Sequence, residues 1–182
     1  MLKVAINGFG RIGRTAFKIA HDKFSKDLEI VAINDLGDTK TLAHLLKYDS
    51  NYGVWDHNIS HDDSGILVNG KKYAVFKEKE PDKLPWGKLS VDVVIESTGR
   101  FTNIEGASLH IQAGAKKVVI SAPAKGGGVP TLVLGVNADK YSGEKIINNA
   151  SCTTNCIAPV AEVINNKFGI LIDQTIITNA LD

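Results

Sequence analysis

Three glycines near the N-terminus have the spacing that lets a backbone turn tightly around a phosphate group. The segment Gly8-Phe9-Gly10-Arg11-Ile12-Gly13 fits the pattern G-x-G-x-x-G. A β-rich run precedes it, a helical pattern follows it, and the acidic Asp35 ends the next apolar run about twenty residues later. In this setting Gly8 permits the turn, Gly10 lets a pyrophosphate approach, and Gly13 lets helix and strand pack closely. The pattern therefore predicts a dinucleotide site, with free helix N–H groups facing the phosphates.

Asp35 distinguishes between two dinucleotides. A carboxylate at this position accepts hydrogen bonds from the hydroxyls of the adenosine ribose and repels a 2′-phosphate. The sequence therefore predicts NAD as the cofactor rather than NADP. The alternative is a structural turn with an incidental aspartate.

Cys152 and Cys156 lie one helical turn apart in a segment of Ser, Thr and Asn. Zinc needs about four ligands, and no histidine lies nearby, so no metal site is predicted. A helix beginning at Thr153 would place Cys152 at its N-terminus, where a thiolate is stabilised. Pro159 would delay or bend that helix. Two alternatives stay open: Cys152 is a nucleophile, or both cysteines are small buried hydrophobic residues.

Apolar runs alternate with helical patterns along the chain. The predicted strands are residues 2–6, 28–33, 66–68, 73–76, 91–96, 118–120 and 132–136, with an Asn-Gly hairpin turn between the third and fourth. Helical periodicity covers residues 12–20, 41–46 (opened by Asp38 or Thr39) and 103–113 (closed by Gly114). This alternation predicts an α/β fold, a Rossmann-type doubly wound and mainly parallel sheet.

Polar side chains follow four of the predicted strands where each strand ends. They are Asn7, Asn34, Ser97 and Ser121. Ligands of open α/β sheets bind at the carboxyl ends of the strands. We therefore expect these four positions to converge on one crevice.

Composition excludes several classes of protein. The chain has 182 residues, 43% of them hydrophobic, and a net charge of +1. This near-neutral balance argues against a nucleic-acid partner. No apolar run is long enough to span a membrane, and no secretory signal opens the sequence. Two cysteines do not make a disulfide scaffold. The sequence predicts a cytoplasmic protein with no membrane partner.

Seven segments together resemble the glyceraldehyde-3-phosphate dehydrogenase family. They occur in that family's order and spacing over most of the chain. The segments are Ile6–Arg14, Ile33–Leu36, Lys47–Ser50 with Gly53, Glu96–Gly99 with Phe101, Ser121–Pro123, Gly135–Asn137 and Ala150–Cys156.

The resemblance implies roles for individual residues. Cys152 would attack an aldehyde carbon, hydride would pass to NAD, and phosphate would release an acyl phosphate from the resulting thioester. Ser151 and Thr153 would contact the substrate or the phosphate. Lys79 stands where the family usually has arginine. The implied cofactor contacts are Asn7, Gly8, Gly10, Arg11, Ile12, Gly13, Asp35, Leu36, Lys79, Ser97, Thr98, Gly99 and Ser121.

The resemblance also implies two parts and a departure from the family. Residues 1–150 would form the NAD-binding domain, and residues 151–182 the truncated start of an α+β catalytic domain. Asn179 stands where the family has a histidine base, so this chain is expected to be inactive alone. Completed by a second half, it would act on a small phosphorylated aldehyde and inorganic phosphate, as a homo-oligomer. The alternatives are an NAD-binding module without catalysis or an erythrose-4-phosphate dehydrogenase relative.

Overall fold

The computed structural model describes residues 1–170, so the predicted departure at Asn179 lies outside the described residues. Four α-helices occur in this range: α1 (Arg11–Lys23), α2 (Thr39–Lys47), α3 (Ile104–Gln112) and α4 (Cys152–Phe168). The strands are β1 (Leu2–Asn7), β2 (Leu28–Asn34), β3 (Tyr48–Asp49), β4 (Gly53–Val54), β5 (Ile59–Asp62), β6 (Gly65–Val68), β7 (Lys71–Phe76), β8 (Val93–Glu96), β9 (Lys117–Ile120) and β10 (Ile146–Asn148).

Eight strands form one sheet in the order β10-β9-β8-β1-β2-β7-β6-β5, while β3 and β4 pair separately. All neighbours from β10 to β7 are parallel, and β6 and β5 add antiparallel pairs at one edge. The predicted doubly wound, mainly parallel α/β sheet is therefore confirmed. The chain leaves β1 first toward β2 and later returns to its other side with β8. This reversal of direction is the place where such sheets bind ligands.

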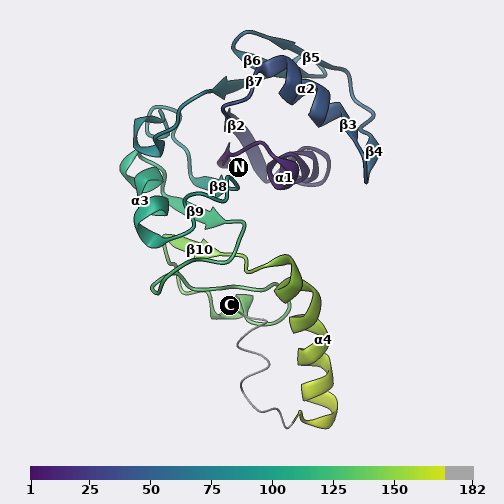
Figure 1. Ribbon diagram of the computed structural model, residues 1–182, viewed down its shortest axis with the longest axis vertical. Coiled ribbons are helices and arrows are strands. Elements are labelled where there is room, and N and C mark those ends of the chain that lie inside the picture. Colours follow the sequence, from purple (N-terminus) through teal and green to yellow (C-terminus); the bar gives the residue numbers. More distant parts are fainter. Residues whose placement is uncertain (171–182) are drawn as a thin grey trace.

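Each face of the sheet carries its own apolar core, because successive side chains of a strand point to opposite faces. In β1, Val4 and Ile6 join the core under α1 and α2, whereas Ala5 joins the core under α3. Phe17 of α1 and Trp86 are among the largest fully buried side chains, one in each core. Figure 1 shows α1 and α2 on one side of the strands and α3 on the other.

The helix ends are capped by residues that the sequence suggested. Asp38, rather than Thr39, caps α2 by accepting a hydrogen bond of 2.8 Å from the Thr41 N–H. That bond also holds the pKa of Asp38 below its usual value. Gly114 follows α3 with a φ of +101°, a left-handed conformation that glycine adopts without strain.

The strand predicted at residues 132–136 is wrong. Only Thr131 forms a bridge, to Asn148, and a turn follows it. The side-chain oxygen of Asn137 accepts the Val133 N–H at 2.7 Å, and Gly135 has a φ of +79°. A side chain that closes a turn and a left-handed glycine end any extended run. The sheet instead gains β10, which we did not predict.

Helix α4 runs through Pro159 without a break and stands beyond β10, away from the sheet (Figure 1). Its apolar side chains, including Val163 and Phe168, are exposed. Even so, none of the helices within residues 1–170 is long and apolar enough to cross a membrane.

Candidate functional site

A cavity of about 280 Å³ opens at the carboxyl ends of β1, β2, β7 and β8. Ligand sites in open α/β sheets occupy this edge. Of the predicted site residues, those that line it come from the end of β1 and the glycine loop, from the residues after β2 and β8, and from Lys79 after β7. The full lining is Asn7, Gly8, Gly10, Asn34, Asp35, Leu36, Glu78, Lys79, Ser97, Thr98, Arg100 and Phe101.

Two glycines of the loop, Gly8 and Gly13, have no space for a side chain, whereas the space beside Gly10 is open. A Cβ on Gly8, which has a φ of +88°, would lie 2.7 Å from the carbonyl carbon of Ser97. A Cβ on Gly13 would lie 2.1 Å from the carbonyl oxygen of Gly8. A Cβ on Gly10 meets nothing within 4 Å. The open side of Gly10 and the adjoining N-terminus of α1 fit the close approach of a pyrophosphate.

Asp35 holds the glycine loop while keeping acceptor sites for a ligand. Its Oδ2 accepts the Phe9 N–H at 2.7 Å, and its Oδ1 accepts the Gly37 N–H at 2.8 Å. A carboxylate has about four acceptor positions, so two remain for ribose hydroxyls. Leu36 lies beside it, half exposed and part of the cavity lining.

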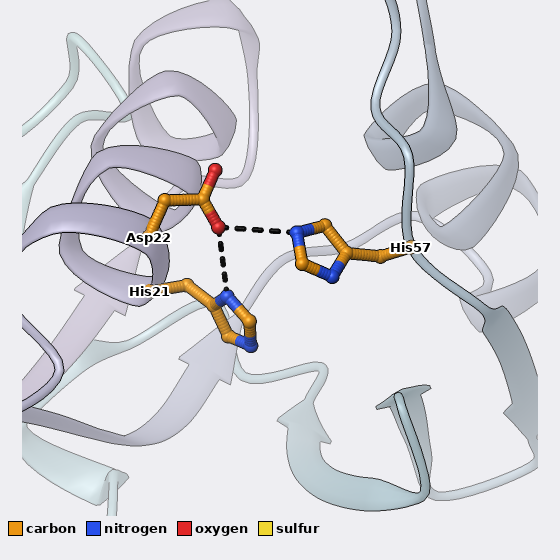
Figure 2. A group of neighbouring side chains, drawn as sticks. All are labelled: His21, Asp22 and His57. Atoms are coloured by element: carbon orange, nitrogen blue, oxygen red, sulfur yellow. Dashed lines mark hydrogen bonds and ion pairs between the residues drawn. The ribbon is translucent and has the colours of Figure 1, made fainter.

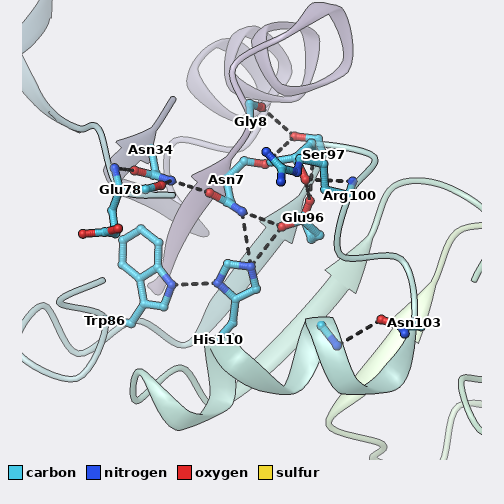
Figure 3. A network of polar contacts seen from close by, with 12 residues as sticks. Asn7, Gly8, Asn34, Glu78, Trp86, Glu96, Ser97, Arg100, Asn103 and His110 are labelled. Atoms are coloured by element: carbon cyan, nitrogen blue, oxygen red, sulfur yellow. Dashed lines mark hydrogen bonds and ion pairs between the residues drawn. The ribbon is translucent and has the colours of Figure 1, made fainter. Parts of the chain in front are cut away.

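A buried carboxylate supports the loop after β8 (Figure 3). Oε2 of Glu96 accepts a hydrogen bond from Asn7 Nδ2 at 2.6 Å and contacts His110 Nε2 at 2.9 Å. Oε1 accepts from the N–H and the hydroxyl of Thr98. Glu96 and His110 are both fully buried. The carboxylate therefore links the ends of β1 and β8 to the cavity residue Thr98.

The tautomer of His110 follows from its partner on the other ring nitrogen. Trp86 Nε1, which can only donate, lies 3.0 Å from His110 Nδ1. Nδ1 is therefore the acceptor, and His110 is neutral with its proton on Nε2, donated to Glu96. The network continues through Asn7 Oδ1, which accepts a hydrogen bond of 2.6 Å from Asn34 Nδ2 (Figure 3).

The sequence did not predict three residues of the cavity lining: Glu78, Arg100 and Phe101. Glu78 follows β7, which we predicted only as half of a hairpin. The antiparallel pair of β7 with β6 is present, but β7 also pairs in parallel with β2. That second pairing brings the end of β7 to the cavity. The Glu80 N–H donates to the Glu78 carboxylate and holds its pKa below the usual value.

Within the described residues 1–170, several of the predicted site residues do not line the cavity. Arg11, Ile12 and Gly13 belong to the first turn of α1, and Gly99 belongs to the loop after β8. Ser121 follows β9, and its N–H donates to the Glu96 carbonyl oxygen at 2.9 Å. Three of the four polar strand ends therefore share the cavity.

Cys152 is the first residue of α4 and is exposed, as is Cys156. The alternative of two buried cysteines is therefore wrong. The hydroxyl of Ser151 caps the helix by accepting the Thr154 N–H at 3.0 Å and lies 2.8 Å from the Thr153 hydroxyl. These residues form a separate group that does not line the cavity.

Comparison with known proteins agrees with this geometry. Residues 2–104 match the family model described as "Glyceraldehyde 3-phosphate dehydrogenase, NAD binding domain". NAD is therefore the cofactor of this domain, as the sequence predicted.

Three curated relatives show the extent of the similarity. The chain is 54% identical over 171 residues to glyceraldehyde-3-phosphate dehydrogenase 1 of Kluyveromyces marxianus, covering 93% of this chain and 51% of the relative. It is 55% identical to glyceraldehyde-3-phosphate dehydrogenase of Thermotoga maritima, covering 94% of this chain and 51% of the relative. For that of Geobacillus stearothermophilus the identity is 54%, with coverage of 93% and 50%. The chain spans about half the length of these relatives.

Fold, glycine loop and cavity thus agree with a family model that matches more than half of the chain. The chain belongs to the glyceraldehyde-3-phosphate dehydrogenase family.

Proposed function

We propose that this chain supplies the NAD-binding part and the nucleophile of a phosphorylating glyceraldehyde-3-phosphate dehydrogenase, an oxidoreductase of glycolysis. The observation that carries the proposal is the cavity at the carboxyl ends of the neighbouring strands β1 and β8, framed by the open side of Gly10 and the carboxylate of Asp35. We propose further that residues 1–150 form the cofactor domain and residues 151–182 begin the catalytic domain.

The residues present fit NAD at this cavity. Gly8 and Gly10, with the N-terminus of α1, would hold the pyrophosphate, and Asp35 and Leu36 the adenosine ribose. Lys79 would lie near the adenine. The remaining proposed contacts are Asn7, Arg11, Ile12, Gly13, Ser97, Thr98, Gly99 and Ser121. When bound, NAD supplies a hydride acceptor.

Cys152 would carry the covalent chemistry. Its sulfur, as the thiolate, would bond to the aldehyde carbon of a small phosphorylated aldehyde while the C=O π pair moves to the oxygen, and loss of the hydride on that carbon, which NAD would accept, would leave a thioester. A phosphate oxygen then attacks the carbonyl, the C–S bond breaks, and the sulfur leaves with its electron pair. The Cys152 N–H would hold the oxyanion, and Ser151 and Thr153 would contact the substrate or the phosphate.

An assay of NAD reduction with glyceraldehyde 3-phosphate and phosphate tests this function. We expect turnover when the chain is mixed with the C-terminal half of a relative such as the Thermotoga maritima enzyme, and little turnover from the 182 residues alone. NAD binding without turnover in the mixture would favour a binding module. A preference for erythrose 4-phosphate as substrate would favour an erythrose-4-phosphate dehydrogenase instead.

Assembly as a homo-oligomer in the cytoplasm is part of the proposal, although one similar protein, from Nicotiana tabacum, is named as chloroplastic.

Replacing Asp35 with alanine should weaken NAD binding roughly tenfold to hundredfold. A hydrogen bond to a charged group contributes about 1.5–3 kcal/mol, and the variant loses the carboxylate that faces the ribose. Isothermal titration calorimetry with NAD and NADP measures the effect, and the preference for NAD over NADP should shrink. Asp82→Ala, at an exposed position away from the cavity lining, is the matched control. Equal NAD affinity in the Asp35 variant and the control would contradict the ribose contact.

Cys152 should react with iodoacetamide faster than Cys156, although both are exposed. The N-terminus of α4 stabilises a nearby negative charge, here the thiolate of Cys152, by about 0.3–1 kcal/mol, which corresponds to a roughly twofold to fivefold higher rate. Cys156 lies one helical turn further along, where this stabilisation is weaker. Mass spectrometry of partly alkylated peptides measures both rates in one sample. Cys156→Ser should leave the Cys152 rate unchanged. Equal rates would remove the argument that the helix activates Cys152.

A further inference from the structure

Three metal-ligating side chains meet on the surface away from the cofactor cavity. His21 and Asp22 lie in the last turn of α1, and His57 lies in the segment between β4 and β5. One ligand atom from each lies within 4.8 Å of the other two. Figure 2 shows both imidazoles directed at the same carboxylate oxygen of Asp22. We call these three residues the His–Asp–His cluster.

Two distances in the cluster, from the Asp22 oxygen to each imidazole, are slightly shorter than those between ligand atoms of a zinc site. Asp22 Oδ1 lies 3.0 Å from His21 Nδ1 and 3.1 Å from His57 Nε2. Zinc bonds of about 2.0–2.2 Å place tetrahedral ligand atoms roughly 3.4 Å apart. The ion would therefore fit if each imidazole nitrogen moved a few tenths of an ångström away from the Asp22 oxygen. The three side chains are 22%, 39% and 23% exposed, so an ion and a water ligand can reach them from solvent.

Neighbouring groups already orient the ligands. Trp55 Nε1 donates to the other carboxylate oxygen, Asp22 Oδ2, at 2.8 Å, which leaves Oδ1 facing the two rings. The His21 ring stacks on Phe17, with centroids 6.3 Å apart, and meets Trp55 edge-on at 5.2 Å. Partners of this kind raise metal affinity because they fix ligand orientation before the metal arrives.

We propose that His21, Asp22 and His57 bind one Zn²⁺ ion, with water as the fourth ligand. Two imidazoles and one carboxylate suit zinc, whereas Mg²⁺ and Ca²⁺ prefer oxygen ligands alone. The bound ion ties the C-terminal turn of α1 to the segment before β5. This site was not predicted from the sequence, because His57 lies 35 residues from Asp22 along the chain.

One rearrangement accompanies binding at His57. Asn69 Nδ2, a donor, lies 2.8 Å from His57 Nδ1, so the ring proton is on Nε2, facing Asp22. Zinc takes the place of that proton, which moves to Nδ1, and the ring stays neutral. Nδ1 then needs an acceptor, but the Asn69 oxygen already accepts the Asn58 N–H at 3.0 Å, so turning the amide toward His57 would cost that bond. Asn69→Asp supplies that acceptor directly, and second-shell acceptors contribute about tenfold or more to affinity.

The test is a titration of Zn²⁺ into the full chain carrying Cys152→Ser and Cys156→Ser, because the two exposed thiols would also bind zinc. Calorimetry should show one saturable site. His57→Gln and His21→Gln should each weaken binding at least tenfold. His61→Gln, at an exposed histidine of β5 outside the cluster, is the matched control and should bind like the parent. Mg²⁺ should give no saturable signal.

Two further measurements keep the outcome clear. Thermal unfolding in EDTA shows whether each variant folds without metal. Added Zn²⁺ should raise the Tm of the parent, which carries the two cysteine substitutions, and of His61→Gln, but not of His57→Gln. Asn69→Asp should bind Zn²⁺ about tenfold more tightly. Absence of saturable binding in the parent, or parental affinity in both histidine variants, overturns the site. Unchanged or weaker binding in Asn69→Asp overturns His57 Nε2 as a ligand. None of these results depends on NAD binding.

Discussion

Alanine at Gly13 should destabilise the domain by about 3 kcal/mol or more and abolish NAD binding. The added methyl would lie 2.1 Å from the carbonyl oxygen of Gly8 and 3.0 Å from Ser97 Oγ. Backbone on one side and the sheet on the other leave it no room, and overpacking of this kind costs about 1–3 kcal/mol, occasionally more. Urea unfolding gives the free energy of unfolding, and calorimetry gives the NAD affinity.

Gly10→Ala is the matched control in the same loop. A Cβ on Gly10 meets nothing within 4 Å, and the residue has an ordinary φ of −72°. This variant should therefore fold with nearly unchanged stability. It should still bind NAD more weakly, because the methyl occupies the side from which a pyrophosphate approaches. If Gly10→Ala binds NAD like the parent chain, the proposed pose of the pyrophosphate is wrong.

Glu96→Ala should lower the free energy of unfolding by about 3–5 kcal/mol, because several buried donors lose their acceptor and each unsatisfied donor costs about 1–3 kcal/mol. The substitution leaves the donors of Asn7, His110 and Thr98 without their acceptor inside the protein. Since Thr98 lines the cavity, NAD affinity should fall as well. Urea unfolding and NAD titration measure the two effects.

Glu96→Gln separates charge and hydrogen bonding from volume. Whichever way the amide faces, its nitrogen meets a donor, either the Thr98 N–H or the Asn7 and His110 nitrogens. We expect a smaller loss, of about 1–3 kcal/mol. Glu80→Gln, at an exposed position, should be neutral. A Glu96→Gln variant as stable as the parent would mean that the carboxylate is not needed at this position.

Much of the fold was predictable because local patterns carry it. The glycine loop sits between β1 and α1 as the spacing indicated, and Asp38, Asn103 and Gly114 end or begin helices by bonds to nearby backbone. Such features depend on residues a few positions apart. They therefore leave a signature that a single sequence preserves.

The errors have two physical causes: a local turn inside an apolar run, and pairing between strands distant in sequence. Residues 132–136 have the apolar character of a strand, but Asn137 and Gly135 close them into a turn, and β10 takes the place beside β9. The hairpin β6–β7 was predicted, but its parallel pairing with β2 was not. Which strand pairs with the other edge of a hairpin strand depends on the packing of the complete sheet.

The sequence by itself determined the chemistry of the cofactor site, because the glycines and Asp35 act through backbone shape and charge at fixed spacing. Only the tertiary structure decided which side chains surround it. In the folded chain Glu78 lines the cofactor cavity, and Glu96 and His110 are buried together behind the loop after β8. His57 lies next to Asp22 at the end of α1. These pairings depend on the order of strands in the sheet, and no local pattern encodes that order.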